Sequence, residues 1–154
     1  MTREIKFRAK VKHHDPMTNP ENGWVEGYYL QDLTQGEMCS YIFQPPCSWE
    51  VIPETVGQFT GLLDKNGKEI YEGDIIEIKE IGGYGCKRKG VVEYDVEECA
   101  FAVRVLPPSW SDIVRLSTRV QICADMNCTH EYINQYTVIG NIHDNLELLK
   151  TETL

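Results

Sequence analysis

The sequence lacks any long apolar run, and its apolar stretches are only a few residues long. A membrane-spanning helix needs about 20 consecutive apolar residues, so the chain is not expected to cross a membrane. The first residues, Met1–Lys6, carry charges, unlike the continuous apolar segment of a secretion signal. We therefore expect a cytoplasmic protein with no membrane partner.

Paired zinc-knuckle cysteines are also lacking, although the chain has 6 cysteines. In the cytoplasm these thiols are expected to stay reduced. Cys123, Cys128 and His130 have a spacing that could supply three zinc ligands. A closed zinc site needs a fourth ligand, and buried thiols commonly act as small hydrophobic groups. We therefore expect no cofactor, and zinc binding is the alternative.

The recognised catalytic motifs are missing as well. No nucleophile elbow, phosphate-binding loop, dinucleotide fingerprint or His-Glu-x-x-His pattern occurs in the sequence. The histidines have no local arrangement that would pair one of them with a nucleophile and a carboxylate. We therefore expect a protein that is not an enzyme and has no catalytic residues.

Basic residues are absent between His13 and Asp64, and the whole chain has 24 acidic and 15 basic side chains, a formal net charge of −9. The segment before this gap, residues 4–12, alternates apolar and charged residues with period two. This alternation predicts a strand that buries Ile5, Phe7, Ala9 and Val11. Its other side presents Lys6, Arg8, Lys10 and Lys12. Such a face commonly guards a sheet edge in solvent, but it could also contact an acidic partner or another subunit.

Nucleic-acid binding is disfavoured by the net charge of −9, because phosphate recognition needs a basic surface. Two features favour it: the basic side of residues 4–12 and the run Lys87-Arg88-Lys89. The candidate contact residues for a partner or a nucleic acid are therefore Lys6, Arg8, Lys10, Lys12, Lys87, Arg88 and Lys89. A further alternative is that the acidic chain imitates DNA and binds a host protein.

Short stretches rich in β-branched and aromatic residues, separated by turn signals, predict most of the fold. They lie at residues 24–30, 38–43, 49–52, 75–78, 91–94, 101–106 and 136–142. Residues 109–135 leave a helix and a pair of short strands open, and Asn145–Leu149 predicts one helical turn with Leu146 and Leu149 facing inward. We expect an all-β or mainly β domain of short antiparallel strands over residues 1–154, which could divide into subdomains 1–57 and 58–154. The order of turns and strands suggests an SH3-like small barrel in the C-terminal half.

Two tight turns stand out. Asp64-Lys65-Asn66-Gly67 predicts a hairpin, because Asn and Gly both tolerate positive φ. Gly73-Asp74 predicts a second turn that begins a strand. We interpret the residues of these turns, and a later pair of the same kind, as fold-specifying: Gly61, Asp64, Asn66, Gly67, Gly73, Asp74, Gly140 and Asn141. A binding groove beside Gly73-Asp74 is the alternative.

Three segments resemble the YopX-like proteins of phages and prophages. Arg3–Ala9 is similar to the opening of that family, Gln58–Ile76 to its central signature and Val138–Leu149 to its ending. The chain departs from the family where Lys10 replaces a tryptophan and Leu146 a proline. The resemblance implies a YopX-like, mainly β, oligomeric protein in the cytoplasm of a bacterial host. It carries over no biochemical role.

The sequence therefore predicts a non-enzymatic, oligomeric interaction or adaptor protein. Its expected partners are further copies of itself and a host or phage protein. In a homo-oligomer the basic strand and the acidic segment could meet head to tail around a closed ring.

Overall fold

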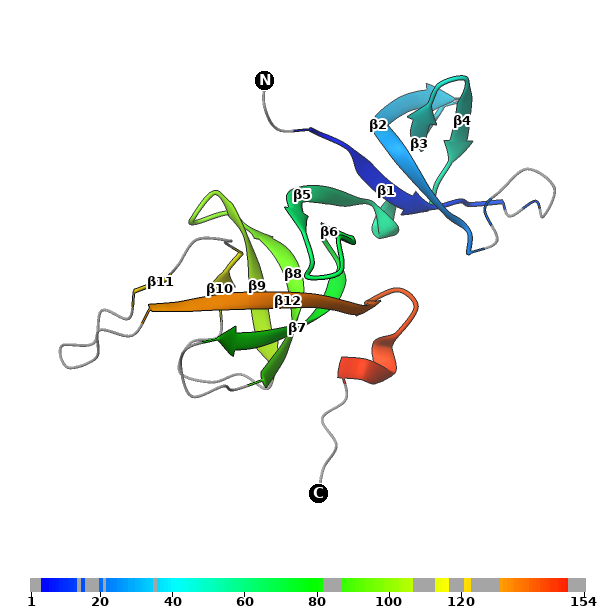
Figure 1. The fold of residues 1–154 in the computed structure, drawn as a ribbon. Helices are drawn as coiled ribbons and strands as arrows, with labels where there is room; N and C mark the ends of the chain where they lie inside the picture. Colours follow the sequence, from blue (N-terminus) through cyan, green and yellow to red (C-terminus); the bar gives the residue numbers. More distant parts are fainter. Residues whose placement is uncertain are drawn as a thin grey trace. The chain divides into compact units, whose positions relative to one another are not determined.

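The computed structural model describes residues 4–13, 15, 20, 22–34, 36–81, 87–106, 113–116, 121–122 and 131–149. These residues form antiparallel strands in two sheets, with two 3-10 helices of three and four residues (Figure 1). The predicted mainly β class is therefore confirmed. The chain divides into two compact units, Met1–Gly61 and Leu62–Leu154, which are described in turn. The single domain over 1–154 with subdomains 1–57 and 58–154 stays a prediction.

The first unit is a meander of four strands whose first strand also pairs with a fifth. The strand order in its sheet is β4-β3-β2-β1-β5-β6, of which β6 (Glu69–Tyr71) comes after the boundary residue Gly61. Its elements are β1 (Phe7–Lys10), β2 (Trp24–Thr34), β3 (Glu37–Gln44), β4 (Cys47–Glu50), η1 (Pro53–Thr55) and β5 (Gly57–Leu63). Strand β5 runs across the boundary between the two units.

The ends of this meander are joined to one another. Val11, just after β1, forms an antiparallel bridge with Val51, just after β4. The Ile52 amide donates to the Lys10 carbonyl oxygen at 2.8 Å. Strand β1 is thus hydrogen-bonded to β2, to β5 and to the residues that follow β4, so backbone groups that would otherwise lie at an open edge are paired.

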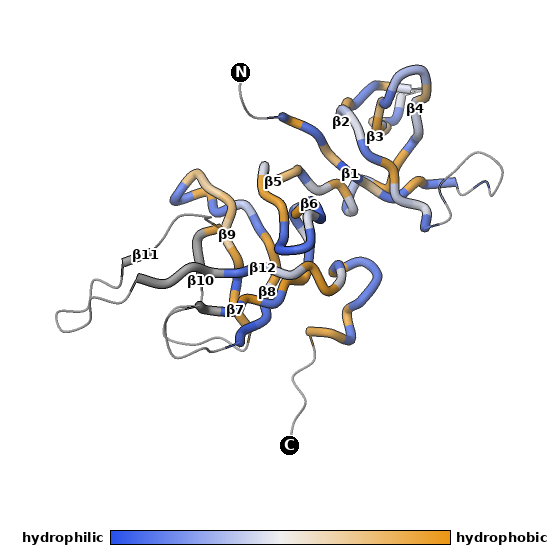
Figure 2. Tube along the Cα trace, in the orientation of Figure 1, coloured by the Kyte–Doolittle hydropathy of each residue, from blue (hydrophilic) through white to orange (hydrophobic). Residues whose placement is uncertain are grey.

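The predicted alternation along β1 is partly confirmed by the core of the first unit. Figure 2 shows this alternation as successive hydrophobic and hydrophilic segments of the tube. Ala9 and Val11 are buried in a cluster with Val25, Ile42 and Val51. Ile5, which was expected on the buried side, is 42% exposed, so this expectation is wrong. The reason is that Ile5 precedes the first residue of β1 and therefore lies outside the paired part of the strand.

The second unit repeats the arrangement. Its sheet has the order β10-β9-β8-β7-β12-β11, so the first strand of a four-strand meander again pairs with a later strand. Its elements are β6 (Glu69–Tyr71), β7 (Asp74–Ile81), β8 (Lys87–Asp95), β9 (Ala100–Leu106), β10 (Ile113–Arg115), β11 (Gln121–Ile122), β12 (Glu131–Asn141) and η2 (Leu146–Leu149). The described part of residues 109–135 forms β10, β11 and the start of β12, with Leu116 directly after β10. The SH3-like closure of this half stays a prediction.

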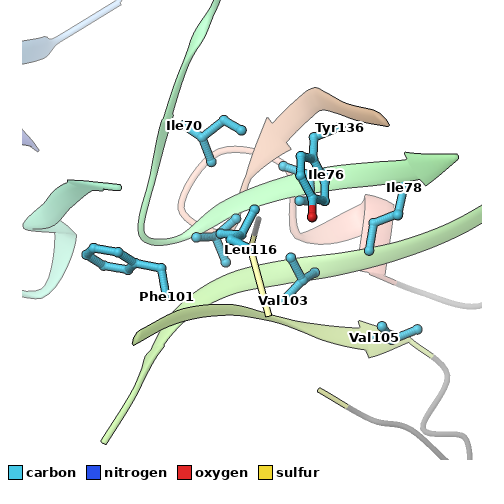
Figure 3. Packing of buried hydrophobic residues seen from close by; sticks show 9 residues of the cluster. Ile70, Ile76, Ile78, Phe101, Val103, Val105, Leu116 and Tyr136 are labelled. Carbon is cyan, nitrogen blue, oxygen red and sulfur yellow. The ribbon is translucent and has the colours of Figure 1, made fainter. Parts of the chain in front are cut away.

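The core of the second unit lies on the inner side of β7, β8, β9 and β12 (Figure 3). Ile76, Val92 and Val103 are at most 1% exposed. The one-turn helix near the C-terminus is present as η2, but Leu146 is 61% exposed, so its expected inward orientation is wrong. In this tighter helix Leu148, instead, approaches Gly140: a Cβ on Gly140 would lie 2.7 Å from the Leu148 Cδ1 atom.

Candidate functional site

The most specific sequence signature forms a turn built around one carboxylate. Asp64 is buried, and its Oδ1 accepts hydrogen bonds from the Asn66 and Lys68 amides at 2.7 and 2.9 Å. Its Oδ2 accepts from the Val138 amide at 3.1 Å. The residue with positive φ is Gly67 (φ 82°), while Asn66 keeps a negative φ. The hairpin is therefore a turn closed by Asp64 with one left-handed glycine, not a two-residue Asn-Gly turn.

These contacts predict how stability depends on pH. Burial raises the pKa of Asp64, but the amides of Lys68, Val138 and Asn66 outweigh it and hold the pKa below its ordinary value of 3.8. A lowered carboxyl pKa stabilises the folded state above the unfolded pKa, and this contribution disappears as the pH falls through the folded value. We expect the urea midpoint to fall between about pH 5 and pH 3, with a smaller fall in Asp64→Asn. Equal falls in the two proteins would contradict this role.

The second predicted turn is packed, not open. Gly73 has φ 79°, its amide donates to the Val92 carbonyl oxygen and its own carbonyl oxygen accepts from the Ile142 amide, both at 2.9 Å. A Cβ on Gly73 would lie 3.4 Å from the Asn141 Nδ2 atom and 3.5 Å from Ile142. The Asp74 carboxylate, 1% exposed, accepts from the Tyr71 amide at 2.9 Å. The site of a Cβ on Gly73 is thus bounded by Asn141 and Ile142.

The remaining signature residues also lie at tight positions. Gly61 has φ 85° in β5. Gly140 leaves no room for a Cβ beside Asn145, and the Asn141 side chain accepts from the His143 amide at 2.9 Å. These signature residues therefore lie at turns and at close contacts within the chain.

The basic side of β1 is partly covered by aromatic rings. Lys6 Nζ lies 5.1 Å from the centre of the Phe59 ring. The Arg8 guanidinium and Lys10 Nζ lie 5.0 and 5.7 Å from the Trp24 ring centre. At these distances a cation is attracted to the π face. These three basic residues are half-buried, so this is not a simple solvated face.

Lys12, the last basic residue of this series, forms an ion pair with an acidic residue of its own unit. Its Nζ lies 2.6 Å from the Glu50 Oε1 atom. The hydrogen bond and the charge of Glu50 raise the pKa of Lys12, and the hydrogen bond from Lys12 lowers the pKa of Glu50. On the same sheet Arg8 stands directly opposite Glu26. The acidic segment thus supplies neighbours for the basic strand within one chain.

The run Lys87-Arg88-Lys89 is divided between two sides of β8. Arg88 stands opposite the core residue Ile78 and is half-buried, whereas Lys87 and Lys89 are exposed. Lys79 on β7, also exposed, is the direct cross-strand partner of Lys87. We call Lys79, Lys87 and Lys89 the lysine face. Sequence reasoning missed Lys79, because only the register of β7 against β8 brings it there.

The β2–β3 hairpin extends beyond the core of the first unit. At its end Leu33 and Met38 are cross-strand partners and are 64% and 62% exposed. Asp32 and Glu37, on the other side of the same strands, are exposed as well. We call Gln31–Thr34 with Gly36–Met38 the hairpin end. Sequence reasoning missed it as one feature, because its turn carries no Asn-Gly or Pro signal.

The zinc candidates Cys123, Cys128 and His130 lie outside the described residues. Within the described part of the chain, no group of three or more His, Cys, Asp or Glu residues is placed to hold a metal ion. In the same part, no helix has the length and apolar character that a membrane crossing requires.

No curated protein matches this sequence. A crystal structure of protein EF1440 from Enterococcus faecalis is similar, with 23% identity over 97% of this chain and 100% of that chain, and a TM-score of 0.47. The family model described as YopX protein matches residues 6–150, and the chain therefore belongs to the YopX family.

Proposed function

We propose that this YopX-family chain is a non-enzymatic interaction or adaptor protein that associates with further copies of itself. The observation that carries the proposal is the exposed hairpin end. Leu33 and Met38 stand side by side on it, each more than half exposed. Apolar side chains gain roughly 25 cal/mol for each Å² removed from water, so a surface that covers this pair is favoured.

Further exposed apolar side chains lie on the opposite face of the same hairpin, which also carries Asp32 and Glu37. Tyr28 and Phe43 are cross-strand partners with exposed fractions of 62% and 37%. Clustered exposed apolar residues, unlike scattered ones, mark interaction sites. The place of action that fits this proposal is the cytoplasm of a bacterial host, with a phage or prophage as the source. A host or phage protein is then a further partner.

Light scattering after size exclusion tests self-association. We expect the wild-type mass to rise with concentration, and the double variant Leu33→Ser/Met38→Ser to raise the dissociation constant at least tenfold. The reason is that serine removes nearly all of the apolar contact area that the pair would bury.

The control is Val96→Ser, which changes a residue that is 77% exposed in the turn between β8 and β9. It should associate like the wild type. A wild type that stays monomeric at every concentration would overturn the proposal, and so would a Val96→Ser variant that weakens association as much as the hairpin variant does.

A further inference from the structure

We propose that the lysine face is a binding surface for the phosphate backbone of duplex DNA. This goes beyond the proposed self-association, and either can hold without the other. The sequence expectation placed nucleic-acid contacts on residues 4–12 and on the run at 87–89. The basic residues of β1 lie against aromatic rings of their own unit. Strand pairing brings Lys79 to the lysine face and places Arg88 on the core side of β8, opposite Ile78.

The basic residues on this side of the sheet follow a diagonal line over three strands. Lys79 of β7 stands opposite Lys87 of β8, and Lys89 is two residues further along β8. Arg104 of β9 stands opposite Val91, the next residue of β8 on this side. With strands about 4.8 Å apart and a rise of about 3.3 Å per residue, neighbouring Cα atoms in the line are roughly 5–8 Å apart. Such a line of cations can follow the regularly spaced phosphates of a nucleic-acid strand.

The lysine face has more positive charge than its own carboxylate balances. All three lysines are exposed, and the Glu77 Oε1 atom lies 3.4 Å from the Lys87 Nζ atom. Lys79 and Lys89 form no ion pair with any residue that the structure describes. Lys79 and Lys87 are like charges in directly opposite positions, a pairing that opposes the stability of a sheet. A phosphate bound between them would remove this repulsion.

The side chains around the lysines favour phosphate over a protein partner. Val91 and Leu106 are half-buried, and the described residues on this side of β7, β8 and β9 include no exposed apolar side chain. The core of a protein interface is rich in aromatic side chains and poor in lysine. Gln135 of β12, the half-buried cross-strand partner of Lys79, adds an amide of the kind that contacts phosphate.

The same surface suits a duplex better than a single strand. Proteins that hold single strands stack the bases on aromatic side chains. Tyr94, an exposed aromatic residue of β8, lies on the core side opposite Phe101 and not with the lysines. The lysine face therefore offers contacts to phosphates and not to bases. A duplex presents phosphates at high density, with one charge for about every 1.7 Å of its axis.

The contact is expected to be weak, because the chain as a whole has a net charge of −9. Further along the sheet, Arg104 Nη2 lies 2.7 Å from Glu93 Oε1, and Asp95 accepts from the Glu97 and Glu98 amides. The basic excess is thus confined to the lysine end of this side. Binding should weaken as salt is added, with a slope of log K against log salt of about −3 for three phosphate contacts.

Fluorescence anisotropy of a short labelled duplex, titrated with the full chain at several salt concentrations, tests the proposal. We expect Lys79→Gln/Lys89→Gln to weaken binding about tenfold at low salt and to reduce the salt slope by about one for each lysine. Glu77→Gln removes the carboxylate within the face and should strengthen binding severalfold. A gain in Glu77→Gln beside a loss in the lysine variant cannot come from unfolding, which would only lower the affinity.

The matched control is Lys65→Gln/Lys68→Gln. It removes the same charge at exposed lysines of the turn between β5 and β6, so it should change the affinity for the duplex less than twofold. Light scattering should show that Lys79→Gln/Lys89→Gln associates with itself as the wild type does. A failure of DNA binding can therefore be told apart from a failure of the proposed self-association.

Several results would overturn the proposal. The first is a wild type that leaves the duplex unbound at the lowest salt concentration. The second is a Lys65→Gln/Lys68→Gln protein that loses as much affinity as the lysine-face variant, because the contact would then be unspecific. Tighter binding to a single strand of the same sequence would show that bases are contacted. Tighter binding to polyglutamate would make the lysine face a surface for an acidic protein.

Discussion

Gly90→Ala is expected to destabilise the second unit by about 3 kcal/mol or more, a large part of the 5–15 kcal/mol that typically holds a domain folded. A Cβ on Gly90 would lie 2.4 Å from the Arg104 carbonyl oxygen and 2.5 Å from the Val103 Cγ1 atom. Gly90 is a buried residue of β8, where it pairs with Val105 of β9, so the clash is with backbone that cannot move without breaking the β8–β9 ladder. Urea unfolding followed by circular dichroism measures the loss.

The contrasting variant is Gly67→Ala. Gly67 has positive φ but nothing within 4 Å of the site where a Cβ would stand, so its cost is confined to backbone conformation, about 1 kcal/mol. If Gly90→Ala and Gly67→Ala lowered the free energy of unfolding equally, the close approach of β9 to Gly90 could not be the cause of the loss in Gly90→Ala.

Asp64→Ala is expected to lower the free energy of unfolding by about 3 kcal/mol, since hydrogen bonds to a charged group are each worth roughly 1.5–3 kcal/mol. The variant leaves the Asn66, Lys68 and Val138 amides without their acceptor. Of these three hydrogen bonds, the one from the Val138 amide joins the turn to a distant strand, because Val138 belongs to β12 and is 74 residues away in the sequence. The loss should therefore loosen the start of β6 and the end of β12 together, which amide hydrogen exchange can follow.

Asp64→Asn gives the graded control. The amide keeps one carbonyl oxygen, so it can accept from Asn66 and Lys68 but not simultaneously offer a second oxygen to Val138. We expect a loss smaller than that of Asp64→Ala, with faster exchange of the Val138 amide. An Asp64→Ala protein as stable as the wild type would show that water replaces the carboxylate without cost.

The sequence predicts strands well here and their pairing poorly. Alternation marks the buried residues Ala9 and Val11, because a side chain's face follows from its position along one strand. The half-burial of Arg8 and Lys10 could not be predicted in the same way. It depends on Trp24, which comes to lie against them only through the register of β2 on β1.

For the candidate surfaces, too, the sequence predicted what depends on neighbouring residues and missed what depends on strand pairing. Lys87 and Lys89 were recognised as a basic run, but Lys79 joins them and Arg88 leaves them only once β7 and β8 are aligned. The signature turns were identified from Asp64 and Gly73, because turn residues act on backbone close in sequence. The bond from Asp64 to Val138 spans most of the second unit and has no local signal.

The two sheets become complete at very different moments of synthesis. In the first sheet β5 pairs with β1 through Gly57 and Gln58, and β6 is its neighbour on the other side, so this sheet has all its strands once Tyr71 has been made. In the second unit β7 waits for β12, which ends at Asn141. Until then one side of β7 exposes unpaired backbone to other nascent chains on the same messenger. Aggregation during translation should therefore arise from the second unit. Substitutions that slow the pairing of β12 with β7 should lower the yield of soluble protein.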